Sequence, residues 1–122
     1  MEGGAIDVNG MGSILLTKEC LLSKIQQRNF GIKKKDYENM LSKFLNVNNF
    51  IWLNKGIKGD DTHGHIDDIC RFVSPDTIMT AIENNKKDVN YKILQTNFNI
   101  LKKAKNINLS LIHIWRCRRM AK

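Results

Sequence analysis

The chain has 122 residues, 42% of them hydrophobic, a composition typical of one small soluble domain or part of a larger one. Its net charge of +8 comes from short lysine and arginine clusters without interleaved aromatic residues, so we expect no nucleic-acid partner. No apolar run reaches membrane-spanning length and no signal peptide is visible, so we expect a cytoplasmic protein without a membrane partner. The three cysteines form no CxxC pair, which argues against a disulfide framework or a zinc ribbon.

The first half of the chain contains a predicted hairpin, a helix and a strand. Apolar runs at 5–8 and 13–17 flank Asn9-Gly10-Met11-Gly12, whose asparagine and glycines tolerate positive φ. Asp36 is placed to cap a helix, and Asn46 follows its predicted end. A short buried strand is predicted at 50–53. The apolar residues of the helix recur at helical spacing and predict a buried stripe: Tyr37, Met40, Leu41, Phe44 and Leu45.

The second half continues with strands at 69–73 and 77–82, which flank the turn residues Ser74-Pro75-Asp76. A second amphipathic helix is predicted through about Lys105, with its apolar face made by Tyr91, Leu94, Phe98 and Leu101. The expected order is β-β-α-β-β-β-α, which indicates an α/β fold.

The C-terminal segment differs in kind from the rest. Residues 109–119 read LSLIHIWRCRR, an apolar run joined to a basic cluster, without capping or turn residues. This amino-acid sequence is typical of translated sequencing-adaptor read-through. We therefore expect a domain at 1–106 and a non-native tail at 107–122, with a genuine basic tail as the alternative.

One segment concentrates ionisable groups. GDDTHGHIDD, from Gly59 to Asp68, holds four carboxylates, two histidines and two glycines. Carboxylates beside imidazoles can move protons or hold a cation at neutral pH. In an extended segment residues two apart face the same side, so His65 and Asp67 can address one ligand. On spacing alone, the cluster could equally cap and solvate a loop. A metal-dependent hydrolase using His63, His65, Asp67 and Asp61 as ligands is a further alternative.

Three stretches resemble, in order, the agmatine deiminase and Porphyromonas-type peptidylarginine deiminase family. They are EGGAIDVNGMGSILLTKECLL from Glu2, IWLNKGIKGDDTHGHIDDICRFV from Ile51, and NYKILQTNFNILKKAK from Asn90. The first two are specific, and the match covers about residues 1–106. The resemblance implies part of a five-bladed α/β propeller, the pentein-like fold of guanidino-group-modifying enzymes, with about two blades present.

The resemblance also implies a reaction, the hydrolysis of a guanidinium group to a urea with loss of ammonia. A cysteine attacks the guanidinium carbon, a histidine protonates the ammonia and then activates water, and carboxylates bind the flat cation. By this resemblance His65 is the general acid/base and Asp67 its catalytic carboxylate partner. Asp61 and Glu2 would bind the substrate. No metal or other cofactor is implied.

The nucleophilic cysteine of the family follows a glycine-rich GxxHC-type stretch, which this chain does not contain. Cys20 and Cys70 match structural positions instead. We expect an inactive fragment of a hydrolase that converts agmatine to N-carbamoylputrescine and ammonia in putrescine biosynthesis. A peptidylarginine deiminase and a non-catalytic basic binding module are the alternatives, and the sequence is compatible with an oligomer of the full-length protein.

Overall fold

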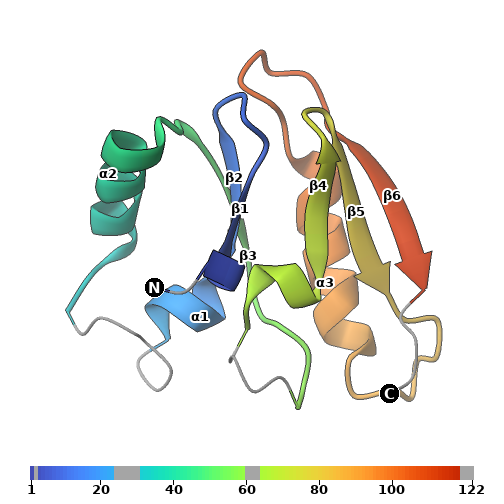
Figure 1. Cartoon of the computed structure of the whole chain (residues 1–122). Helices are drawn as coiled ribbons and strands as arrows, with labels where there is room; N and C mark the ends of the chain where they lie inside the picture. Colours follow the sequence, from blue (N-terminus) through green and yellow to red (C-terminus); the bar gives the residue numbers. More distant parts are fainter. Residues whose placement is uncertain (2, 24–30, 60–63, 119–122) are drawn as a thin grey trace.

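The computed structural model describes residues 1, 3–23, 31–59 and 64–118. It contains two three-stranded sheets and three helices (Figure 1). Sheet A holds β1 (Ile6–Val8), β2 (Ser13–Thr17) and β3 (Asn49–Leu53), and sheet B holds β4 (Cys70–Ser74), β5 (Thr77–Ile82) and β6 (His113–Arg118). The helices are α1 (Lys18–Leu22), α2 (Lys34–Leu45) and α3 (Tyr91–Lys103), with short 3-10 turns η1 (Gly3–Ala5) and η2 (Ile66–Asp68). None of these helices is long and apolar enough to cross a bilayer.

The two sheets share one topology. In each, the first two strands form an antiparallel hairpin, and the third strand returns parallel to the second after a helical crossover. The crossover contains α1 and α2 in the first half of the chain and α3 in the second. The described residues therefore form two consecutive ββαβ units, visible side by side in Figure 1.

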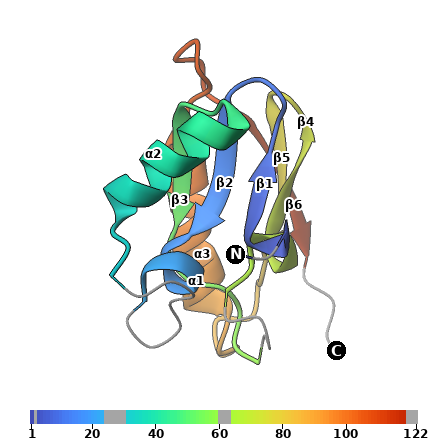
Figure 2. The same ribbon diagram turned by 60° about the vertical axis from the view of Figure 1, so that its left-hand side comes forward.

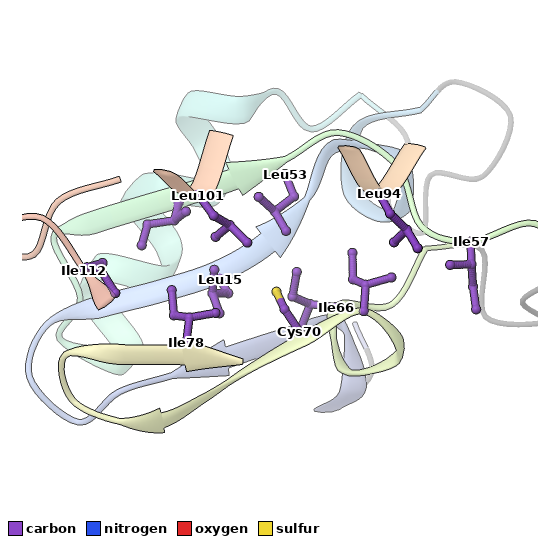
Figure 3. Packing of buried hydrophobic residues seen from close by; sticks show 11 residues of the cluster. Leu15, Leu53, Ile57, Ile66, Cys70, Ile78, Leu94, Leu101 and Ile112 are labelled. Atoms are coloured by element: carbon purple, nitrogen blue, oxygen red, sulfur yellow. The ribbon is translucent and has the colours of Figure 1, made fainter. Parts of the chain in front are cut away.

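Sheet A lies in the middle of the molecule, because its strands alternate apolar side chains between two faces. Ile14, Leu16 and Trp52 join a core with α1 and α2, whereas Leu15 and Ile51 join another with α3 and sheet B. Figure 2 shows α2 and α3 on opposite sides of sheet A. In Figure 3 the side chains of α3 lie on one side of the second core and those of sheet B on the other.

Most predicted elements are confirmed, and α2 differs in detail. It begins at Lys34, so Asp36 lies in its first turn, where the carboxylate accepts a hydrogen bond from the Lys33 N–H at 2.9 Å. Asn46 ends the helix with φ of 54°. The predicted burial of Phe44 and Leu45 is wrong, since they are 73% and 42% exposed. The last turn of α2 contributes no buried residue, and Val47 beyond it enters the core instead.

A sixth strand was missed because its residues lie in the segment predicted to be a tail. β6 pairs with β5 in register from Thr77↔His113 to Ile82↔Arg118. Ile112 is buried in the core of sheet B, and Ile114 packs against it. These contacts show that the segment can take a strand position. The domain boundary near 106 stays a prediction.

Candidate active site

Gly4, in the N-terminal motif, lies close to His65 and Asp67 of the acidic segment. A Cβ atom placed on Gly4 would lie 2.7 Å from His65 Nδ1 and 2.6 Å from Asp67 Oδ2. The imidazole and the carboxylate therefore both lie against the backbone of η1 and close to one another. His65 is only 6% exposed, whereas Asp67 is open to solvent. A buried imidazole beside an accessible carboxylate is an arrangement suited to proton transfer on a bound cation.

The local backbone is not the extended segment that was expected. Ile66–Asp68 forms the 3-10 turn η2, with His65 at its N-cap in a non-helical conformation (φ −54°, ψ 136°). His65 and Asp67 thus converge because one precedes the turn and the other lies within it. The predicted proximity is supported, but the strand alternation offered as its reason is wrong.

The chain on either side of the acidic loop is held tightly. Gly64 has a φ of +98°, and its carbonyl accepts a hydrogen bond from Thr17 Oγ1 at 2.6 Å. The Gly56 N–H donates to Glu19 Oε1 at 3.1 Å. A Cβ atom on Gly56 would lie 2.5 Å from Gly64 Cα, and one on Gly64 would lie 2.8 Å from Glu19 Oε1. Because neither glycine has a side chain, the backbones at Gly56 and Gly64 can approach closely. This contact fixes the position of the chain just before His65.

Two asparagines of the second unit hold the segment that leads into the loop. Asn97 is 1% exposed, accepts a hydrogen bond from the Asn54 N–H at 3.0 Å, and donates one to the Lys55 carbonyl at 2.7 Å. Asn90 accepts a hydrogen bond from the Lys58 N–H at 2.7 Å. These side chains form hydrogen bonds with the backbone of this segment, as a neighbouring strand would in a sheet.

Both asparagines were missed by sequence reasoning, which took the helix of 91–103 as an ordinary amphipathic element. A signal was present: Asn97 follows Leu94 by three residues and precedes Leu101 by four, on the buried stripe. A buried amide needs hydrogen-bond partners. An asparagine on the buried face of a helix therefore indicates that its amide forms hydrogen bonds with the backbone of a segment packed against that face.

A carboxylate also links the two sheets. Asp7 of β1 accepts a hydrogen bond from the Phe72 N–H of β4 at 2.7 Å, and its other oxygen lies 3.4 Å from Arg71 Nε. Arg71 therefore pairs with a carboxylate of the other sheet. Burial raises the pKa of the adjacent Cys70 thiol, Asp7 raises it further, and Arg71 opposes them. Cys70 is therefore a protonated structural thiol at neutral pH.

Three candidate site residues lie outside the described residues: Glu2 and Asp61 of the predicted substrate site, and His63 of the alternative metal site. Nothing in the geometry therefore bears on the substrate-binding roles of Glu2 and Asp61. In the part of the chain that the structure does describe, no group of three or more histidine, cysteine, aspartate or glutamate side chains is placed to hold a metal ion. The alternative metal site requires His63 and stays untested.

Comparison with known proteins gives the family. The model of the Porphyromonas-type peptidyl-arginine deiminase family matches residues 1–120. The chain belongs to this family. An agmatine deiminase homologue of Legionella pneumophila (strain Paris) is 44% identical over 106 residues, which make up 87% of this chain and 30% of that protein.

Solved structures of this deiminase family have the same fold. The agmatine deiminase of Enterococcus faecalis superposes with a TM-score of 0.91 at 30% identity, over 99% of this chain and 33% of that one. An agmatine deiminase variant of C. jejuni with substrate bound gives a TM-score of 0.84 at 34% identity, over 96% of this chain and 33% of that one. The chain thus spans about a third of the length of these deiminases.

Two of the three cysteines are buried, as structural residues would be. Cys20 and Cys70 are buried in the two cores, whereas Cys117 on β6 is exposed. Trp52, in the strand predicted to be buried at 50–53, packs in the core with α2.

Proposed function

We propose that residues 1–106 supply the acid/base part of the active site of a guanidinium deiminase. The favoured reaction is the hydrolysis of agmatine to N-carbamoylputrescine and ammonia, a step of putrescine biosynthesis. The observation that carries this proposal is the convergence of His65 and Asp67 on Gly4, in a family whose relatives are named as agmatine deiminases. A cytoplasmic location and an oligomeric full-length enzyme stay predictions.

The roles of the residues follow from their chemistry. His65 donates a proton to the departing ammonia and then withdraws one from the attacking water. Asp67 offers an accessible carboxylate, which can accept paired charge-assisted hydrogen bonds from a planar guanidinium. We assign the remaining carboxylate contacts to Asp61 and Glu2. The cysteine that attacks the guanidinium carbon would come from the part of the full-length enzyme that this chain does not span.

The same proposal extends to the fold. We interpret the two ββαβ units as two of the five blades of a pentein propeller, and residues 107–122, which include β6, as a non-native replacement that occupies the place of the native third strand of the second unit. The repeated topology supports the first part, and the chain's share of its relatives supports the second. Long-read sequencing of the gene through codon 106 tests the second part. A frame that continues to a glycine-rich stretch with histidine and then cysteine supports it, and a frame that ends after Lys122 contradicts it.

A chimaera tests the activity. Residues 1–106 replace the homologous segment of the Enterococcus faecalis agmatine deiminase, and release of ammonia and N-carbamoylputrescine from agmatine is measured. We expect turnover that falls about 1,000-fold with His65→Ala and about 100-fold with Asp67→Asn, because general acid/base and charge contacts are worth this much. Lys86→Ala, on an exposed connection, is the matched control and leaves turnover unchanged.

Two results of the chimaera experiment would count against the proposal. Turnover that survives His65→Ala would remove the assigned acid/base role. Turnover of peptides ending in arginine, without turnover of agmatine, would replace the favoured substrate by the peptidylarginine alternative. The unmodified chain on its own is expected to release no ammonia from agmatine.

A further inference from the structure

A groove of about 460 Å³ runs along the outer edge of sheet A. β3 is the last strand of that sheet, and Asn49, Phe50, Ile51 and Trp52 line the groove in succession. The other walls come from the α1/α2 layer on one side and from the end of α3 on the other. Since Figure 2 shows these two layers on opposite faces of sheet A, the groove must lie at the strand edge between them.

The phase of the strand ladder shows which backbone groups the groove contains. The Asn49 N–H donates to the Gly12 carbonyl at 3.0 Å, on the side of β2. In a parallel ladder alternate residues turn their N–H and C=O groups to opposite sides. Phe50 and Trp52 therefore direct these groups outward, into the groove. The Asn54 N–H has the same phase, and the side chain of Asn97 meets it from outside the sheet.

The charge of the groove is one-sided. Its lining includes four exposed lysines and no acidic residue: Lys18, Lys34, Lys103 and Lys105. Lys34 Nζ lies 5.7 Å from the centre of the Trp52 ring. The carboxylate of Glu38, which accepts a hydrogen bond from Trp52 Nε1 at 3.0 Å, keeps its charge but does not line the groove. An anionic partner would therefore find attractive charge on both faces of an open strand.

We propose that this edge binds an acidic peptide segment, in extended conformation, as an added strand beside β3. Main-chain hydrogen bonds to Phe50 and Trp52 would supply the pairing, and the lysines would select carboxylates. Because an extended segment alternates its side chains between two faces, consecutive acidic residues would reach Lys18 and Lys34 on one face and Lys103 on the other. A second copy of this chain is disfavoured, because edge-to-edge pairing would oppose two sets of lysines. The groove is separate from His65 and does not depend on the deiminase proposal.

The test uses the whole 122-residue chain and a fluorescein-labelled peptide, Glu-Glu-Val-Glu-Glu, read by fluorescence anisotropy at low salt. We expect the double variant Lys34→Glu/Lys103→Glu to weaken binding at least about tenfold, since two attractive charges become repulsive. The matched control Lys86→Glu/Lys87→Glu changes the net charge equally, on an exposed connection away from the groove, and should change the Kd less than about twofold. Circular dichroism checks that each variant is folded.

A second probe separates strand addition from charge attraction alone. The same peptide carrying N-methyl groups at alternate amides keeps its charge but loses the donors that an added strand needs. We expect at least about tenfold weaker binding of this probe. Equal weakening by the two lysine pairs, unchanged binding of the N-methylated peptide, or no binding of the parent peptide would each overturn the proposal. The lysines would then serve only to guard an open edge against aggregation.

Discussion

Gly4 has no room for a side chain, because the His65 imidazole and the Asp67 carboxylate occupy the space where a Cβ atom would project. Its neighbour Gly3 faces open space. In the chimaera, Gly4→Ala should lower kcat/KM by about 100-fold, since a displacement of about 1 Å at reacting groups has an effect of this size. Gly3→Ala is the control and should stay within about twofold. Equal effects of the two substitutions would show that η1 does not position the pair.

The three cysteine thiols differ in their exposure to solvent. Cys117 is exposed, while Cys20 and Cys70 are buried. At pH 8 iodoacetamide should modify Cys117 in the folded chain, and Cys70 only after unfolding, since thiolate is the reactive form and the pKa of Cys70 is raised. Mass spectrometry of tryptic peptides gives the result. Rapid labelling of Cys70 in the folded chain would contradict the described burial.

The raised pKa of Cys70 also fixes the sign of a pH effect. The folded chain holds the proton more tightly than the unfolded chain, so this group stabilises the fold fully below the ordinary thiol pKa of about 8.5. Above that pH the unfolded chain loses the proton first. The free energy of unfolding should therefore fall as the pH rises, and Cys70→Ala should flatten the fall.

At the scale of elements, α3 supports the loop before His65 through Asn97. Asn97→Ala would leave the Asn54 N–H and the Lys55 carbonyl unpaired, at a cost of about 2 kcal/mol in the free energy of unfolding. Asn99→Ala, two residues further on the exposed side of the same helix, should cost less than about 0.5 kcal/mol. Urea denaturation gives both values. A loss as small for Asn97 as for Asn99 would remove the supporting role.

The elements that sequence predicted well are those with one dominant signal. The turn after Val8 and the apolar faces of Leu94 and Leu101 each follow from local chemistry. Phe44 was placed in the core because periodicity shows which side of a helix is apolar, but not where the sheet beneath it ends. β6 was missed because it pairs with β5 through a tertiary contact, which the composition of residues 113–118 does not indicate.

The candidate site was predictable in a similar, partial way. The family motif located His65 and Asp67, and their closeness to Gly4 agrees with it. The 3-10 turn that brings the pair together was not predictable, because the chain before it is held by contacts of Gly64 with Thr17 and Glu19, which are distant in sequence.

For the whole molecule, the two units differ in how well they are covered. Sheet A is covered on both faces, whereas the outer face of sheet B carries the exposed apolar residues Val73, Met79 and Trp115. Such a face favours association. Sedimentation should show self-association of the isolated chain that rises with concentration and decreases with Met79→Glu. The control is Met11→Glu, because Met11 is exposed on the hairpin turn of sheet A. This substitution should leave the self-association unchanged. A monomer at all concentrations would contradict this.

The hydrogen bond from the Phe72 amide to Asp7 has a consequence for how the chain comes apart. Phe72 lies in an edge strand, and its N–H is held by a side chain of the other unit rather than by a strand partner. Deuterium can replace that proton when this hydrogen bond opens, either because the two units part or because the Asp7 side chain turns away. The exchange rate of this amide therefore reports on the contact between the two units rather than on the hydrogen bonds within sheet B.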